Sequence, residues 1–159
     1  MPAATRLVAI RHGETAWNAV QRLQGWQDIP LNPRGRRQAA ALGPALAGEG
    51  LVAVVASDLQ RARQTGQALA EALGLPLLAE PALRERGFGV LEGLTPAQIE
   101  ADRPDDARRW RTREPAWRPD GGESLLDVQA RSLAAVERIA ARFAGQAVAL
   151  VSHGGVVDL

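Results

Sequence analysis

The chain has 159 residues, a length that suits one domain, and its 46% of hydrophobic residues is ordinary for a globular protein. It contains no cysteine, which excludes thiolate metal sites and cysteine nucleophiles. All 19 basic residues are arginine, so a P-loop lysine and a Schiff-base lysine are excluded too. The formal net charge of +1 is below the basic excess typical of nucleic-acid or membrane-surface binders. Because the apolar run at residues 7–10 is too short for a signal peptide or a membrane span, we expect a cytoplasmic protein that binds neither nucleic acid nor membranes.

Four apolar segments predict the strands of a sheet. Residues 7–10, 51–56 and 147–151 are apolar at every position, and residues 75–79 form a weaker fourth segment. Strands that are apolar at every position are typical of parallel sheets, because helices cover both faces of such a sheet. We therefore expect these segments to pair in parallel.

Capping residues and apolar periodicity predict the helices between the strands. Asn32, followed by proline, is typical of a helix start, and we expect that helix to run toward residue 47. Apolar residues at helical spacing predict a second helix over residues 59–73 and a third after Ser124. Thr95, also followed by proline, predicts a short helix.

The alternation of strands and helices predicts a three-layer α/β/α fold with a mostly parallel central sheet. A polar segment at about residues 87–122, rich in arginine, aspartate, proline and tryptophan, is expected to form a helical cap over one edge of the site. We expect residues 1–159 to form one domain. Because so few residues follow the last apolar run, we also expect a C-terminal segment that the printed sequence lacks or that is not ordered.

Two histidines occur in the chain, and their settings match. His12 and His153 each come directly after a predicted buried strand and are each followed by glycine. Ligands of parallel sheets bind outside the carboxyl ends of the strands, so two neighbouring strands would place both imidazoles in one pocket. The alternative is that each histidine is an isolated polar residue at a strand end. The matching contexts favour a shared site.

Charged residues near these positions suit an anionic ligand. Arg11 directly precedes the first histidine, and Arg61 lies in the first turn of its predicted helix. A cation at a helix N-terminus opposes the helix dipole, unless a bound anion lies there. An arginine that reaches away from the helix end is the alternative. Glu85 is suited to donating a proton to a leaving oxygen, although its spacing favours a surface ion pair with Arg84 or Arg86.

Five blocks of sequence occur in the order found in a known family. Residues 11–18 read Arg-His-Gly-Glu-Thr-Ala-Trp-Asn, and residues 57–65 read Ser-Asp-Leu-Gln-Arg-Ala-Arg-Gln-Thr. Further matches are residues 24–39, residues 83–93, and residues 152–155 with the sequence Ser-His-Gly-Gly. Over essentially its whole length the chain resembles the histidine phosphatase superfamily, the phosphoglycerate-mutase-like enzymes.

The resemblance implies a role for each matching residue. His12 would be the nucleophile, Glu85 the acid that protonates the leaving oxygen, and Arg11, Arg61 and His153 the groups that hold the phosphoryl oxygens. The remaining predicted substrate-binding residues are Gly13, Glu14, Thr15, Asn18, Gln24, Gly25, Arg86 and Gly154. The partner would be a small phosphorylated metabolite, with no metal and no cofactor, because fixed positive groups can stabilise the charge of phosphoryl transfer.

Two activities share this machinery in the family: phosphate hydrolysis, and the isomerisation catalysed by phosphoglycerate mutases. Arg108 and Arg109 resemble the paired arginines of mutases, which would also need 2,3-bisphosphoglycerate as a primer; the alternative is a solvated helix in which Asp105 pairs with Arg109. The short insertion, the lack of lysine and the Gly122-Glu123-Ser124 block favour a phosphatase, with the mutase as the alternative. A non-catalytic phospholigand sensor ranks last, because such a protein would be expected to lose His12 or Glu85.

The substrate and the assembly stay open at this point. Phe88, Trp110 and Trp117 in the predicted cap either face a substrate or form the core of the cap, and aromatic residues more often do the latter. A homodimer also stays open.

Overall fold

The computed structural model describes residues 3–159 and contains a four-stranded sheet. The strands are β1 (Arg6–Arg11), β2 (Leu51–Ala56), β3 (Leu77–Ala79) and β4 (Ala147–Ser152). Their order is β1-β4-β2-β3, and every neighbouring pair is parallel. The sheet predicted from the apolar segments is therefore confirmed.

Strand β3 is shorter than the predicted segment of residues 75–79. Leu75 donates its N–H to the carbonyl of Ala70 and so closes the preceding helix. Pro76 has no N–H to give to a neighbouring strand, although its carbonyl accepts from Val54 at 3.0 Å. Parallel pairing therefore begins at Leu77.

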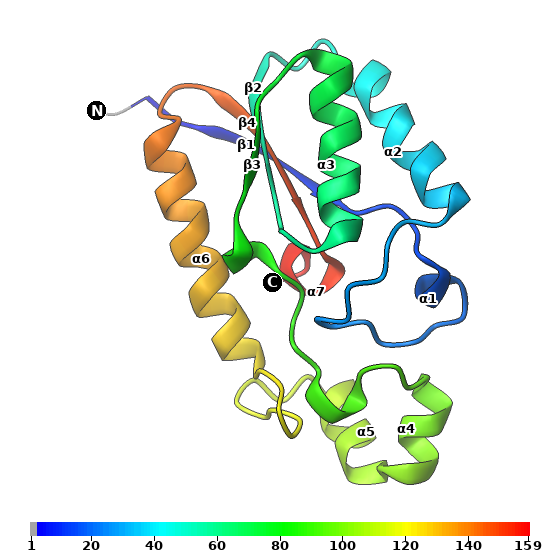
Figure 1. Ribbon diagram of the computed structural model, residues 1–159. Coiled ribbons are helices and arrows are strands. Elements are labelled where there is room, and N and C mark those ends of the chain that lie inside the picture. Colours follow the sequence, from blue (N-terminus) through cyan, green and yellow to red (C-terminus); the bar gives the residue numbers. More distant parts are fainter. Residues whose placement is uncertain (1–2) are drawn as a thin grey trace.

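Helices cover both faces of the sheet. Helices α2 (Pro33–Leu46) and α3 (Gln60–Leu73) lie on one face, and α6 (Leu125–Arg142) lies on the other, as Figure 1 shows. The three-layer α/β/α fold predicted from the sequence is confirmed. The strands run toward the region that holds the short helices α1 (Ala16–Ala19) and α7 (Gly154–Val157) (Figure 1).

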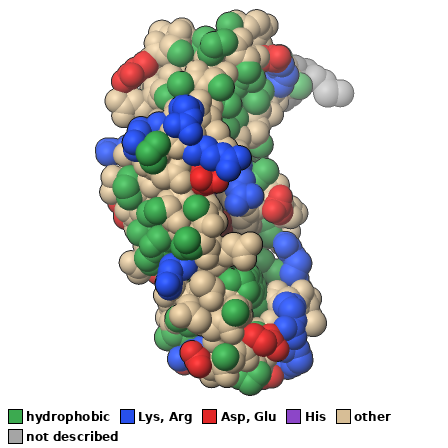
Figure 2. Space-filling model, turned by 90° about the vertical axis from the view of Figure 1, so that its right-hand side faces the viewer, with side chains coloured by type: hydrophobic (Ala, Val, Ile, Leu, Met, Phe, Trp, Pro, Cys, Tyr) green, Lys and Arg blue, Asp and Glu red, His purple; other side chains and the backbone are tan. Residues whose placement is uncertain are grey.

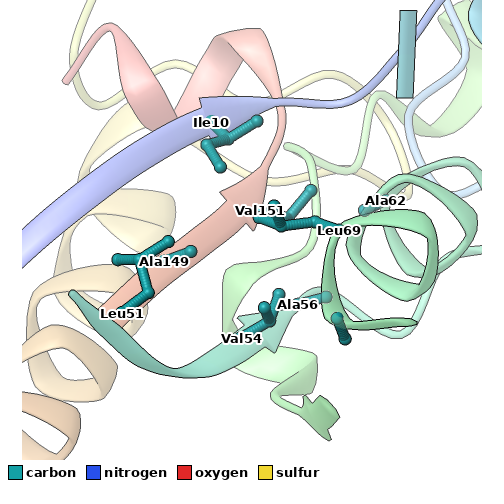
Figure 3. Packing of buried hydrophobic residues seen from close by; sticks show 9 residues of the cluster. Ile10, Leu51, Val54, Ala56, Ala62, Leu69, Ala149 and Val151 are labelled. Carbon is teal, nitrogen blue, oxygen red and sulfur yellow. The ribbon is translucent and has the colours of Figure 1, made fainter. Parts of the chain in front are cut away.

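Two apolar cores separate the layers. Alternate side chains of the inner strands point to opposite faces, so Val54 and Val151 pack toward α2 and α3, whereas Val55 and Leu150 pack toward α6. Figure 3 shows the first of these cores, with Leu69 of α3 packed against the strands. Fully burying such a side chain contributes about 1.5–3 kcal/mol, so the two cores fix the positions of the strand ends.

Three helix ends follow the local signals in the sequence. The side chain of Asn32 accepts from the N–H of Gly35 at 2.8 Å, and Ser124 forms a reciprocal cap with Asp127. Gly74 ends α3 with a φ of 65°, a left-handed conformation that favours glycine.

The polar segment of residues 87–122 contains a 3₁₀ turn, η2 (Gly89–Leu91), and two helices, α4 (Pro96–Asp102) and α5 (Pro104–Arg111). A second 3₁₀ turn, η1 (Pro81–Leu83), precedes it. The helices lie together below the carboxyl edge of the sheet (Figure 1) and pack around Leu91, Ile99 and Ala107. That residues 1–159 form one domain stays a prediction.

The surface carries a group of exposed arginines at the start of α2. Arg34, Arg36 and Arg37 are exposed, and Figure 2 shows arginines gathered over the face that carries this helix. Within residues 3–159 no helix combines the length and the apolar character needed to cross a membrane.

Candidate active site

Three polar residues stand side by side at the carboxyl edge of the sheet. His12 follows β1, His153 follows β4, and Ser57 follows β2, the strand on the other side of β4. The two imidazole centroids are 5.2 Å apart, and the ring planes are inclined by 58°. The prediction that neighbouring strands bring the two histidines together is therefore confirmed by the geometry.

The His12 ring is oriented by its own neighbour in the chain. Its Nδ1 lies 2.6 Å from the carbonyl oxygen of Gly13. Because a carbonyl oxygen can only accept, Nδ1 carries the proton and Nε2 keeps its lone pair. Burial, together with the charges of Arg61 and Arg11, lowers the pKa of His12 to about 4. The imidazole is therefore neutral near pH 7, with Nε2 available as a nucleophile.

The lowered pKa of His12 has a consequence for stability. Below pH 6.5 the unfolded chain binds a proton at this histidine, whereas the folded chain does not until the pH approaches 4. The folded state should therefore lose about 3 kcal/mol of stability from His12 as the pH falls from 7 to 4. Urea unfolding of the wild type and of His12→Asn over this range measures the difference. Parallel pH profiles for the two proteins would contradict the lowered pKa.

Arg61 is completely buried at the start of α3, despite its charge. Its Nη1 donates to the carbonyl of Gln27 at 2.9 Å and its Nη2 donates to the carbonyl of Gly25 at 2.8 Å. Its Nε has no hydrogen-bond partner within the described residues. Its hydrogen bonds go to neutral carbonyls, and within the described residues no carboxylate forms an ion pair with it, which suits an anionic ligand.

The second histidine is also completely buried. Its Nε2 lies 2.8 Å from Ser57 Oγ, whereas its Nδ1 has no partner within residues 3–159. Burial and the nearby charge of Arg61 lower the pKa of His153 well below its ordinary value. Arg11 is exposed at the same edge and lies against Gly154. A Cβ on Gly154 would lie 3.3 Å from the Arg11 guanidinium carbon.

Glu85 faces this group from the segment after η1. The N–H of Arg86 donates to its Oε1 at 2.8 Å, and the N–H of Gly155 donates to its Oε2 at 3.3 Å. Gly155 permits this approach, since a Cβ there would lie 2.2 Å from Oε1. Burial raises the pKa of Glu85. A carboxyl whose pKa is raised keeps its proton at higher pH, which suits a general acid. The surface ion pair considered for Glu85 is not formed; Arg84 pairs with Asp58 instead.

Four of these groups line a cavity of about 470 Å³, whereas His153 lies buried behind them. Arg11, His12, Arg61 and Glu85 supply charged and polar groups to its lining. Leu23, Phe88, Pro96 and Trp110 supply an apolar wall. Phe88 and Trp110 therefore face the cavity while also packing on the core of the cap, whereas Trp117 belongs to that core and does not line the cavity. A ligand that carries a charged group at one end and a larger, less polar portion at the other fits a cavity with these charged and apolar parts.

Several predicted substrate-binding residues border the site. Asn18, Gln24 and Gly25 line the main cavity, and Glu14 lines an adjoining hollow beside His12. Thr15 is completely buried behind them, where its single hydroxyl proton has two acceptors in reach, Gln24 Oε1 at 2.7 Å and Asn18 Oδ1 at 3.0 Å. Its contacts give Thr15 a supporting position, and a direct substrate contact stays a prediction.

Three other predicted residues lie away from the cavity. Arg86 is buried under the cap, where it donates to the carbonyls of Glu123 and Trp117. On α5, Arg108 and Arg109 both pair with Asp105, as expected for a solvated helix. None of the three lines the cavities found at the site.

Sequence reasoning gave no role to residues that hold the site together. Thr65 accepts from the N–H of Gly13 at 3.0 Å, beside the predicted nucleophile. Arg131 of α6 donates to the carbonyl of Glu85 at 2.9 Å and binds both carboxylate oxygens of Glu123 at 2.8 Å. An arginine on the half-buried face of a helix was the available signal for Arg131. Groups of three or more potential metal ligands are not found among the described residues.

The cavity brings His12 together with a buried guanidinium and a protonatable carboxyl, and His153 lies beside His12. This arrangement suits phosphoryl transfer. The model of the histidine phosphatase superfamily (branch 1) matches residues 7–159. The chain is 41% identical to the glucosyl-3-phosphoglycerate phosphatase of Mycobacterium tuberculosis over 97% of its length and 72% of that protein. It is 38% identical to a probable phosphoglycerate mutase of Yersinia pestis, over 91% of its length and 67% of that protein.

A solved structure of mycobacterial glucosyl-3-phosphoglycerate phosphatase in complex with VO3 is also similar. Its TM-score is 0.89 at 41% identity, with 96% of this chain and 76% of that chain covered. The chain belongs to the histidine phosphatase superfamily. The predicted family, the fold and the assignment as a phosphatase are thereby confirmed.

Proposed function

We propose that the chain hydrolyses a small phosphomonoester through a phosphohistidine formed on His12. In the first step Nε2 attacks phosphorus, the bond to the leaving oxygen breaks, and Glu85 gives that oxygen its proton. In the second step water attacks phosphorus, Glu85 takes a proton from the water, and the bond to Nε2 breaks to release phosphate. The observation that carries the proposal is the free Nε2 of His12 beside the buried charge of Arg61.

The charges at the site suit this reaction without a metal. Phosphoryl transfer spreads negative charge over the equatorial oxygens, and fixed donors stabilise that charge. Arg11, Arg61 and His153 would supply those donors, and Asn18 would assist from the cavity wall. We therefore propose that the enzyme needs no metal and no cofactor, and that activity in EDTA equals activity without it.

The substrate is proposed from the cavity and from the relatives. Its phosphate would lie among the arginines, and the remainder would lie along Phe88 and Trp110. Glucosyl-3-phosphoglycerate, the compound in the names of the mycobacterial relatives, has this division between a charged end and a sugar. It is the first compound to include in a substrate panel.

A mutase activity is the second candidate, because relatives named as probable phosphoglycerate mutases share 38% identity with the chain. The arginine pair that would serve it does not support it, since Arg108 and Arg109 are bound to Asp105 on the outside of α5. The cytoplasmic location, the absence of nucleic-acid and membrane partners and a homodimer stay predictions.

One experiment separates the two candidates. Phosphate release from a panel of phosphomonoesters is measured in EDTA, beside conversion of 3-phosphoglycerate to 2-phosphoglycerate primed with 2,3-bisphosphoglycerate. We expect phosphate release without mutase flux. Mutase flux with little hydrolysis would favour the second candidate over the proposal. No activity in either assay would refute both candidate functions.

A further inference from the structure

Ser57 occupies a place at the carboxyl edge that the reaction scheme does not use. It directly follows β2, is completely buried, and lies 2.8 Å through its Oγ from Nε2 of His153. The N–H of Leu59 also approaches the same Oγ, at 3.4 Å. The hydroxyl therefore lies between a backbone donor and an imidazole nitrogen.

The His153 ring has one proton to place. Burial and the charge of Arg61 lower its pKa well below the ordinary value, so the ring is neutral near pH 7. A neutral imidazole carries its proton on either Nδ1 or Nε2, and the hydrogen bond at one nitrogen determines the other. The direction of the bond to Ser57 therefore determines what Nδ1 can do.

Counting hydrogen bonds decides that direction. If Nε2 donated to Ser57, the buried hydroxyl proton would have no acceptor within residues 3–159, and the lone pair of Nδ1 would have no donor. If Ser57 donates to Nε2, the hydroxyl is satisfied, Leu59 donates to it, and a single group stays unpaired, the N–H at Nδ1. Buried polar groups are seldom left unpaired, so the second arrangement is preferred.

A second buried nitrogen lacks a hydrogen-bond partner at the same edge as His153 Nδ1. It is Arg61 Nε, which has no partner in the described part of the chain. The charge of Arg61 lowers the pKa of both His153 and His12, so the three side chains are close enough to interact electrostatically. A donor at Nδ1 would add to the binding of an anion there, whereas a lone pair would repel it.

We infer that Ser57 is a positioning residue: it donates its proton to Nε2 of His153 and thereby holds His153 in the tautomer with the proton on Nδ1, ready to donate to a phosphoryl oxygen. This inference rests on the proposed function for its ligand, the phosphoryl group. The tautomer itself exists without substrate, so it can be measured independently of turnover.

The first test reads the tautomer directly. Long-range ¹H–¹⁵N spectra of histidine rings report which nitrogen carries the proton, and the chain has two histidines to resolve. The His12→Asn variant assigns the His153 signals. We expect the proton on Nδ1 in the wild type and a growing Nε2–H population in Ser57→Ala. A proton on Nε2 in the wild type, or an unchanged tautomer in Ser57→Ala, would overturn the inference.

The second test measures binding of inorganic phosphate as a competitive inhibitor. Ser57→Ala should weaken phosphate binding by roughly 10- to 100-fold, as expected for a hydrogen bond to a charged group, and Ser57→Thr should restore much of it. Ser132→Ala is the matched control, because Ser132 is a buried serine of α6 that lines none of the cavities at the site. Unchanged phosphate binding in Ser57→Ala would count against the inference.

The two tests separate this inference from the proposed function. If Ser57→Ala fails to fold, the wild-type tautomer still decides. If the wild type hydrolyses no phosphomonoester, the proposed function fails, whereas a wild-type Nδ1–H tautomer would still support the role of Ser57 in orienting His153.

Discussion

Replacing His12 with alanine should lower kcat/KM for every phosphomonoester by roughly 10⁴- to 10⁶-fold, as expected when a covalent nucleophile is lost. The reason is geometric, because Nδ1 is bound to the Gly13 carbonyl and Nε2 is the imidazole nitrogen left to attack. The second imidazole, that of His153, is completely buried against Ser57 and is not placed to replace His12. Steady-state kinetics with p-nitrophenyl phosphate measures the loss.

The same variant should keep its fold and its affinity for phosphate. Arg61 stays anchored to the carbonyls of Gly25 and Gln27, neither of which depends on His12. A pre-steady-state burst and a phosphoryl group on His12 by mass spectrometry are expected in the wild type and not in the variant. Full turnover by His12→Ala with the fold intact would remove His12 as nucleophile and with it the phosphohistidine.

The features that sequence predicted are those determined locally. Continuous apolar runs are enough to predict buried parallel strands, and Asn32 and Ser124 mark helix starts because their side chains cap the chain next to them. The shared histidine pocket follows from topology, since β1 and β4 are neighbours in the sheet. The pattern of parallel strands is enough to assign His12 and His153 to one edge of the sheet, whereas their direct proximity and the inward direction of Arg61 come from the structure.

The features that sequence missed depend on packing between distant segments. Arg131 contacts the segment before Glu85 only because α6 packs against that part of the chain. Arg86 is of a residue type that commonly binds anions, yet the fold of the cap turns its side chain toward the carbonyls of Glu123 and Trp117. The chain spacing of Ser57 and His153, 96 residues, gives no hint of their contact.

Replacing Glu85 with glutamine should lower kcat/KM most for substrates with poor leaving groups. The general acid is needed when an alkoxide departs, and its removal should cost about 10²- to 10⁴-fold for an alkyl phosphate. p-Nitrophenyl phosphate releases p-nitrophenolate, which is a stable anion without protonation, so its hydrolysis should be affected much less. Glutamine keeps the shape of the side chain, and its Oε1 can still accept from the N–H of Arg86, whereas its Nε2 cannot accept from Gly155. The comparison of good and poor leaving groups therefore separates loss of the proton from loss of this second hydrogen bond.

The pH profile gives a second measure of the same residue. Because burial raises the pKa of Glu85, its acid form persists to higher pH than that of an ordinary carboxyl, and activity should fall as the pH rises through this raised pKa. The high-pH decline with an alkyl phosphate should disappear in Glu85→Gln. Glu80→Gln is the matched control, because Glu80 is a half-buried carboxylate that pairs with Arg138 away from the cavity. An equal loss for alkyl and p-nitrophenyl phosphates would show that Glu85 positions the substrate and does not donate the proton.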